Sequence, residues 1–343
     1  TDSDVAVGSV NSDLDNTARA IQFAIDNATT EYSTVRVGPG IYNSSSDILI
    51  DSDGLTLEGP NAGTPANESR KNEATINRTV KIDNASDVTV DGFKIAEGSR
   101  QLTSGVSIQP GSSGADGITV TNSIIENMSA AGGGGTSDFT FGVLSFGGNL
   151  SDVTITDNRI ANIGEPGGTQ GVAVSLQSLT GTTAGTGATV ERNTIRNVSS
   201  LNSTRVGTGV ALRSNFNGND SAADIAGNSF AGLGIAVSHP EGDTATVDRT
   251  DLATVVVDDP GLTNQQRIFT PTVQDAVTAA EPDATVEVGP GTFEESVTVD
   301  VPSVTVESDT SATPTVVGQS SVAVSIESPG VTLSDLTIQN PQG

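Results

Sequence analysis

The chain has 343 residues, with 42 Asp and Glu against 15 Lys and Arg, which gives a formal net charge of −27. This charge repels nucleic acid and anionic lipid, so we exclude a nucleic-acid partner. Cysteine is absent, which excludes disulfides, thiolate nucleophiles and Cys-based zinc sites. No apolar run approaches the roughly 20 residues that a membrane-spanning helix needs, so we expect no span in this segment.

The acidic excess and the scarcity of lysine favour a protein that works at high salt. Only Lys71, Lys81 and Lys94 are lysines. Molar salt shortens the Debye length to about 3 Å, so repulsion among the carboxylates largely disappears. An acidic secreted protein from an ordinary organism is the alternative.

Near the start of the chain, residues 17–28 predict a short helix. Ile21, Phe23, Ala24 and Ile25 lie close to helical spacing. Asn16 or Thr17 can serve as the N-cap. We expect this helix to cover the first coil of a repeat structure, because an open solenoid exposes its core.

The middle of the chain repeats a strand block every 35 residues. The blocks begin at Ile118, Val153, Ala188 and Ala223, and the segments from Val88 and Val331 fit the same template. Apolar and polar residues alternate within each block, as a half-buried strand requires. A second family of short strands lies between the blocks and starts at Gly105, Gly142, Gly171, Gly209 and Gly234.

Short strands that recur in a fixed order predict an all-β, right-handed parallel β-helix solenoid with short N-terminal capping helices. A β-sandwich is disfavoured, because clear two-residue hairpin turns between matched strands are missing. The extra residues of each 35-residue period are expected in glycine-rich arms at 132–135, 164–168 and 180–187.

The pattern begins again in the last third of the chain. Residues 270–280 predict a second helix (about 271–281) with Pro271 in its first turn. The segment 285–293 then repeats the segment 34–42. We therefore expect two tandem β-helix units at 1–250 and 251–343, joined across an acidic, polar link at 241–251.

The motif Val37-Gly-Pro-Gly-Ile-Tyr42, with the segment 55–63, resembles the pectate-lyase-like right-handed β-helix superfamily. It is most similar to haloarchaeal β-helix repeat surface glycoproteins. The resemblance implies the fold, but the superfamily includes both enzymes and adhesins. The Gly-His-Gly and Arg-Ile-Lys segments of its polygalacturonases are absent, and we expect no catalytic residues. The single histidine, His239, is interpreted as a terminal or surface residue without a catalytic partner.

We expect no cofactor and no metal site, and Ca²⁺ bound by Asp83, Asp87 and Asp91 is the alternative. These three aspartates lack EF-hand and nonapeptide spacing, so a solvated acidic surface is favoured. Arg159, which lies on a coil, lacks an obvious aspartate cluster of the kind found in lyases. Carboxylate pairs that meet across coils remain an open alternative for glycoside hydrolysis.

Asparagines at the repeat spacing predict a structural ladder along the solenoid at Asn127, Asn162, Asn197 and Asn340. Asn127 and Asn197 also begin N-x-Ser/Thr sequons, so a glycan there is the competing interpretation. The remaining sequons predict N-linked glycans at Asn27, Asn43, Asn67, Asn77, Asn84, Asn149, Asn202 and Asn219.

Together these patterns favour an extracellular structural or adhesive glycoprotein of a halophile's cell surface, part of a filament or of a larger surface protein. The chain ends at Gly343 in mid-coil, so we expect either that the natural chain continues or that copies associate end to end. The alternative is a polysaccharide-active lyase or hydrolase.

Overall fold

A computed structural model describes residues 5–7, 18–28, 33–96, 103–111, 114–129, 139–165, 169–177, 179, 187–200, 206–213, 222–240, 245–258, 265–309 and 313–340. The chain divides into a first unit (Thr1–Gly232 with Thr244–Val247) and a second unit (Leu233–Asp243 with Asp248–Gly343). None of the described helices is long and apolar enough to cross a membrane.

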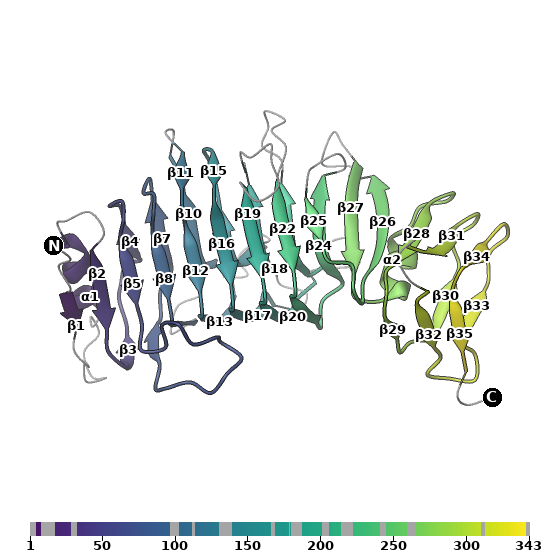
Figure 1. Ribbon diagram of the computed structural model, residues 1–343, viewed down its shortest axis with the longest axis horizontal. Helices are drawn as coiled ribbons and strands as arrows, with labels where there is room; N and C mark the ends of the chain where they lie inside the picture. The colour runs from purple at the N-terminus through teal and green to yellow at the C-terminus, as the bar shows by residue number, and fades with distance from the viewer. Residues whose placement is uncertain are drawn as a thin grey trace. The chain divides into compact units, whose positions relative to one another are not determined.

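The first unit is a right-handed parallel β-helix, as the 35-residue repeat predicted. Each coil adds one strand to each of three parallel sheets, and the strands stack in chain order (Figure 1). Sheet A contains β1 (Val5–Val7), β2 (Thr34–Val37), β5 (Thr56–Glu58), β8 (Thr89–Asp91), β12 (Thr119–Thr121), β16 (Val153–Thr156), β19 (Ala188–Glu191), β22 (Ala223–Ala226) and β25 (Thr246–Val247). Sheet B contains β3 (Gly40–Tyr42), β6 (Ala74–Ile76), β9 (Lys94–Ala96), β13 (Ile124–Met128), β17 (Arg159–Ile163), β20 (Thr194–Val198) and β23 (Ser229–Ala231).

In this unit, sheet C contains β4 (Ile48–Ile50), β7 (Val80–Asp83), β10 (Ser104–Gln109), β14 (Phe139–Ser145), β18 (Gln170–Gln177) and β21 (Thr208–Arg213), and a small ladder pairs β11 (Ala115–Asp116) with β15 (Leu150–Ser151). The second strand family of the sequence thus forms sheet C. Its glycines allow close approach to sheet B. A Cβ on Gly142, for example, would lie 2.6 Å from the side chain of Ile160.

Successive coils bury equivalent residues on top of one another. Ile95, Ile125 and Ile160 are fully buried and lie in register on neighbouring strands of sheet B. Alternate residues of each strand point away from this core. The outward residues therefore also form columns along the solenoid, and these columns position the candidate sites.

Helix α1 (Ala18–Asp26) lies at the start of the first unit, where the sequence predicted a cap. Ile21, Ala24 and Ile25 are buried as expected, whereas Phe23 is 69 % exposed. The Gln22 side chain accepts from the Leu49 N–H at 2.7 Å and donates to the Leu49 carbonyl at 3.0 Å. The amide thus hydrogen-bonds β4 as a neighbouring strand would, and satisfies backbone groups at the sheet edge.

The second unit also forms coils, but it begins with antiparallel pairing that the sequence analysis did not anticipate. Strands β24 (Ile235–Pro240) and β26 (Ala253–Asp258) pair antiparallel with β27 (Gln265–Thr270), and β26 also pairs antiparallel with β28 (Thr285–Val288). Parallel stacking follows in β28, β31 (Thr305–Ser308) and β34 (Thr332–Ser334), in β29 (Thr292–Phe293), β32 (Thr315–Val317) and β35 (Thr337–Gln339), and in β30 (Val297–Val299) and β33 (Val324–Ile326).

Helix α2 (Val273–Ala279) lies in the second unit as predicted, but Pro271 precedes it instead of standing in its first turn. Thr272 is the N-cap, and its side chain accepts from the N–H of Asp275. Gln274 repeats the role of Gln22, because its side chain bonds both the N–H and the carbonyl of Thr298 on β30.

The predicted link differs from the expectation, and the predicted glycine-rich arms lie largely outside the described residues. Thr246 and Val247 form β25 and pair with β22, so the predicted link contributes a strand of sheet A. The expected glycine-rich arms fall largely on 130–138, 166–168 and 180–186, outside the described residues.

Candidate functional site

The outer face of sheet B carries a line of basic side chains. Lys94, Arg159 and Arg196 stand at outward positions of β9, β17 and β20, and we call these three residues the basic strip. Lys94 and Arg159 both pair in register with Ile124, and Arg196 pairs with Ala161. The repeat places them there, because equivalent residues of successive coils share one face.

Glu126 on β13 lies between two members of the basic strip. Its Oε1 is 2.7 Å from Lys94 Nζ, and its Oε2 is 2.6 Å from Arg159 Nη2. Burial alone would raise the pKa of Glu126, but the hydrogen bonds and charges of Lys94 and Arg159 outweigh it and lower that pKa. Glu126 therefore stays ionised, holds the two cations side by side and leaves an excess of positive charge on this face.

One residue of the basic strip retains capacity for a ligand. The Nε of Arg159 has no hydrogen-bond partner in the described structure, but it is buried and closed to a ligand from outside. Arg196 is exposed and makes no ion pair with any described residue. Guanidinium groups present planar arrays of donors that match carboxylates, so this face can hold anionic groups.

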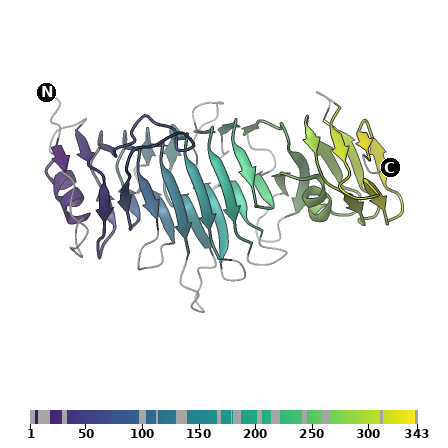
Figure 2. The same ribbon diagram turned by 90° about the horizontal axis from the view of Figure 1, so that it is seen from below.

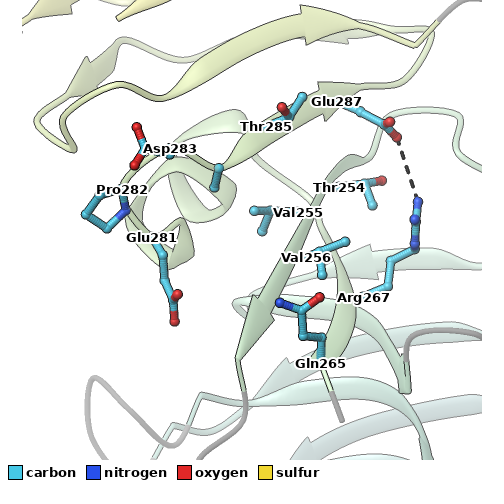
Figure 3. A pocket seen from close by; sticks show the side chains of 11 residues that line it. Thr254, Val255, Val256, Gln265, Arg267, Glu281, Pro282, Asp283, Thr285 and Glu287 are labelled. Carbon is cyan, nitrogen blue, oxygen red and sulfur yellow. Dashed lines mark ion pairs between the residues drawn. The ribbon is translucent and has the colours of Figure 1, made fainter. Parts of the chain in front are cut away.

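A pocket of about 310 Å³ opens in the second unit, among β26, β27 and the segment after α2. Figure 3 shows Glu281 and Asp283 on one side of it and Arg267 on the other, with Val256 between them. The carboxylate of Glu287 lies 3.8 Å from Arg267, as the dashed line marks. The lining can accommodate a small polar or cationic molecule.

Arg249 neutralises the acids beside this pocket. Its guanidinium lies 2.7 Å from Glu287 Oε2 and 2.8 Å from Asp309 Oδ2. Together with Arg267, two arginines face the two carboxylates, so the charges of this cluster cancel. This cluster therefore stabilises the start of the second unit and gives no sign of a reaction.

The acidic trio considered for calcium does not converge on one point. Asp83 pairs with Lys81 at 2.8 Å. Asp91 instead accepts from the Asn122 amide and the Gly63 N–H, and burial raises the pKa of Asp91 despite these bonds. Across the described part of the chain, no group of three or more His, Asp or Glu side chains is arranged to hold a metal ion.

A long loop after β5, residues 59–73, crosses the turns of neighbouring coils, and we call it the strap. The N–H of Gly59 donates to the Asp91 carbonyl, and the N–H of Ala66 donates to the Asp157 carbonyl. The Arg70 side chain donates to the Asn122 carbonyl. Figures 1 and 2 show the strap as the long dark-blue loop. Gly92 permits this approach, because a Cβ there would lie 2.1 Å from the strap backbone.

The structure brings three of the four predicted ladder asparagines together. The Asn162 amide donates to Asn127 Oδ1 at 2.8 Å, and Asn197 donates to Asn162 Oδ1 at 3.0 Å. All three are exposed, have positive φ angles and belong to β13, β17 and β20, so this column lies on the exposed face of sheet B and not in a buried turn. Asn340 belongs to the second unit and donates to Ser321 O instead.

A second, buried asparagine column was missed in the sequence. Asn158 and Asn193 are each 1 % exposed, and they stack with Asn228 in the turn between sheets A and B. Each side-chain oxygen accepts from the backbone N–H one coil earlier, and each amide donates to a strand carbonyl. The sequence does contain a signal for this column, because all three asparagines occupy the sixth position of the aligned strand blocks.

The predicted glycosylation sites occupy different environments. Asn67 stands exposed on the strap, and Asn27, Asn84 and Asn149 are also exposed. The amide of Asn77 instead donates to Asn43 Oδ1 at 2.6 Å, which ties two sequons to each other. Asn202 and Asn219 lie outside the described residues.

His239 is buried, which corrects its interpretation as a surface residue. It is 4 % exposed, its Nδ1 lies 2.8 Å from the Pro240 carbonyl, and its ring stacks on Phe269. The apolar environment of the antiparallel strands explains this position. Packing against Phe269 accounts for a histidine at this buried position.

Comparisons with known proteins give a distant structural similarity. No family model matches the sequence, and no curated protein matches it. A solved structure of a mutant PL6 family alginate lyase, AlyGC, is similar with a TM-score of 0.37 and 12 % identity. The match covers 94 % of this chain and 49 % of that chain, so this chain spans about half the length of that protein.

Proposed function

We propose that this chain is the scaffold of an extracellular structural or adhesive protein on the cell surface of an organism that lives at high salt. The observation that carries the proposal is that two columns of asparagine side chains hydrogen-bond successive coils of the first unit to one another. Asn193 is hydrogen-bonded to the coils on either side of it inside the turn, and Asn162 is bonded likewise on the outside. Such columns tie successive coils together and support a stiff scaffold that holds outward loops in place.

Composition and surface features support the proposed setting. The net charge of −27 suits a solvent in which salt screens like charges. Asn67 is exposed on the strap, so its side chain is accessible to a glycan. Val322, Ile326 and Ile338 of the second unit are exposed apolar side chains that self-association would cover, so filaments belong to the proposal.

The test uses native material. Cell fractionation with immunogold labelling should place the protein on the outer surface, and glycopeptide mass spectrometry should find a glycan at Asn67. Electron microscopy in the native salt should show filaments. Recovery only from the soluble intracellular fraction, with every sequon unmodified, would contradict the proposal.

The grouping of Lys94, Glu126 and Arg159 favours a second candidate, a lyase that acts on an acidic polysaccharide. Abstraction of a proton beside a carboxylate needs a base and a positive charge that stabilises the enolate-like transition state. The Glu126 carboxylate is a base, and Lys94 and Arg159 supply positive charge beside it on one open sheet face. Turnover of a polyuronate that disappears in Lys94→Gln would establish this activity, and an absence of unsaturated products across a panel of polyuronates would retire it.

A further inference from the structure

The outer face of sheet A carries a column of threonines along the first unit. The strands of this sheet stack in chain order (Figure 1). From β2 onward, the first outward position in register is threonine on every strand but one, with Thr34, Thr56, Thr89, Thr119, Thr154, Thr189, Asp224 and Thr246. We call the unbroken run from Thr34 to Thr189 the threonine column.

Strand propensity alone does not explain the threonine column. Threonine favours strands in general, so propensity would fill every outward column of the solenoid alike. The column that lies in register on sheet B is mixed, with Ile41, Thr75, Lys94, Ile124, Arg159, Thr194 and Ser229. A requirement specific to the face of sheet A therefore keeps threonine there.

The hydroxyls of the threonine column are not used by the protein itself. Their side chains are half-buried at outward positions, and none of these Oγ1 atoms hydrogen-bonds another residue in the described part of the chain. Thr121 and Thr156 on the same face show the contrast, because Thr121 Oγ1 lies 3.0 Å from the Thr156 carbonyl oxygen and 3.2 Å from Thr156 Oγ1. The column hydroxyls therefore keep a donor and acceptors for a partner outside the chain.

The threonine column is uncharged, although the chain carries a net charge of −27. Charged residues at the next outward position of sheet A have partners in the protein. Glu58 pairs with Arg36 at 2.9 Å, Glu191 pairs with Arg192 at 2.8 Å, and Asp91 accepts from a side-chain amide. The face therefore suits an uncharged partner that both donates and accepts hydrogen bonds.

Strand stacking gives the threonine column a fixed repeat. Neighbouring strands lie about 4.7–4.9 Å apart, so the hydroxyls from Thr34 to Thr189 form a row of about 24 Å. Oxygen atoms along the a axis of hexagonal ice have nearly the same repeat. We infer that the threonine column binds a crystal face of ice, a function that goes beyond the proposed one and does not depend on it. Each hydroxyl hydrogen-bonds a lattice water, and each methyl group contacts the ice beside it.

The buried asparagine column keeps this row in place. It lies in the turn that follows the sheet A strands, and the Asn158 amide donates to Asn193 Oδ1 at 3.1 Å. The strands that carry Thr154 and Thr189 are thus tied at a constant spacing before ice is met. A surface organised in advance loses less conformational entropy when it binds.

The experiment measures thermal hysteresis, which is the gap between the melting and growth temperatures of a single ice crystal. It is done at the lowest NaCl concentration that keeps the protein folded, because salt lowers both temperatures together and leaves the gap to report adsorption. The original protein should open a gap and give faceted crystals. Thr119→Lys combined with Thr154→Lys should lose most of the gap, since long charged side chains hold the face off the lattice. Thr194→Lys is the matched control, because Thr194 is an outward threonine of sheet B, and it should keep the gap.

A second double variant, Thr119→Val with Thr154→Val, removes the hydroxyls and nearly keeps the side-chain shape, so its folding is secure. It should narrow the gap while its circular dichroism spectrum stays unchanged. The inference is overturned if the original protein gives no gap, if either double variant keeps the full gap, or if Thr194→Lys loses as much as the lysine double variant. Loss of self-association by the double variants, with no gap for the original protein, would assign the face to a second copy of the chain instead.

Discussion

At the scale of single residues, the buried asparagine column carries more of the fold than the exposed one. The Oδ1 of Asn193 accepts from the Asn158 backbone and side chain, and its Nδ2 donates to the carbonyl of Ile155 and to Asn228. These groups lie away from water, so a lost partner leaves them unsatisfied. Asn197, by contrast, is exposed and can exchange its partners for solvent.

Asn193→Ala should therefore lower the free energy of unfolding by about 2–4 kcal/mol, because several buried groups lose partners together. Urea unfolding at constant high salt measures it. Asn197→Gly is the matched control, since glycine tolerates the positive φ at that position, and its effect should stay below about 1 kcal/mol. Equal effects from the two variants would show that burial does not distinguish the columns.

Glu295 gives the second unit a pH dependence. Its carboxylate accepts from the N–H groups of Val273 and Gln274 at the start of α2. Burial nevertheless raises its pKa, and the charge of Asp275 adds to the rise. A carboxyl group with a raised folded-state pKa stabilises the fold below its unfolded pKa, and this contribution is lost as the pH rises through the folded value.

Replacing Glu295 by Gln should remove this dependence while keeping an acceptor for the helix N–H groups. The difference in unfolding free energy between Glu295→Gln and the original protein should shift in favour of the variant as the pH rises from about 4.5, the ordinary glutamate value. Chemical unfolding across a pH series measures the difference. A flat difference for Glu295→Gln across the pH series would contradict the assignment.

At the scale of elements, each unit uses a glutamine of its N-terminal helix to close a sheet edge. Gln22 bonds Leu49, and Gln274 bonds Thr298, in both cases through the backbone N–H and carbonyl. The shared geometry is independent of helix length. An amide is suited to this role because it is donor and acceptor at once.

Gln274→Glu should destabilise the second unit by about 1–2 kcal/mol, because the carboxylate keeps the acceptor but faces the Thr298 carbonyl without a donor. Hydrogen exchange at the amides of β30 should accelerate. Gln319→Glu, at an exposed glutamine of the same unit, controls for the added charge. Unchanged protection of β30 in Gln274→Glu would show that packing of α2 closes the edge without the amide.

Elements with a repeat were the ones that the sequence predicted well. The blocks at Ile118 and Val153 align by period, so their strands and the parallel fold followed from counting. The strands β26 and β27 have no equivalent elsewhere in the chain, and their antiparallel pairing depends on contacts that no period reveals. The Glu126 ion pairs were missed for a related reason, because register across coils brings Lys94 and Arg159 to one carboxylate.

At the scale of the whole molecule, the charge distribution is the dominant physical feature. Described ion pairs such as Arg36–Glu58 and Arg192–Asp157 are largely exposed, and exposed pairs contribute about 0–1 kcal/mol each. They cannot offset the mutual repulsion behind a net charge of −27. The solenoid core and the asparagine columns must therefore hold the fold against that repulsion, and salt must reduce it.

We therefore expect stability to increase steeply with salt. Between about 0.1 M and 1 M, the Debye length falls from about 10 Å to about 3 Å, below the separation of most surface carboxylates. Circular dichroism during thermal unfolding across an NaCl series should show a rising midpoint. Replacing exposed Glu68, Glu281 and Glu294 together by Gln removes three negative charges, so the variant should reach the same midpoint at lower salt. Sucrose at matched osmolality separates screening from preferential exclusion, because it strengthens burial without screening charge. Equal midpoints at low and high NaCl, or an effect that sucrose fully reproduces, would falsify charge repulsion as the origin of the salt requirement.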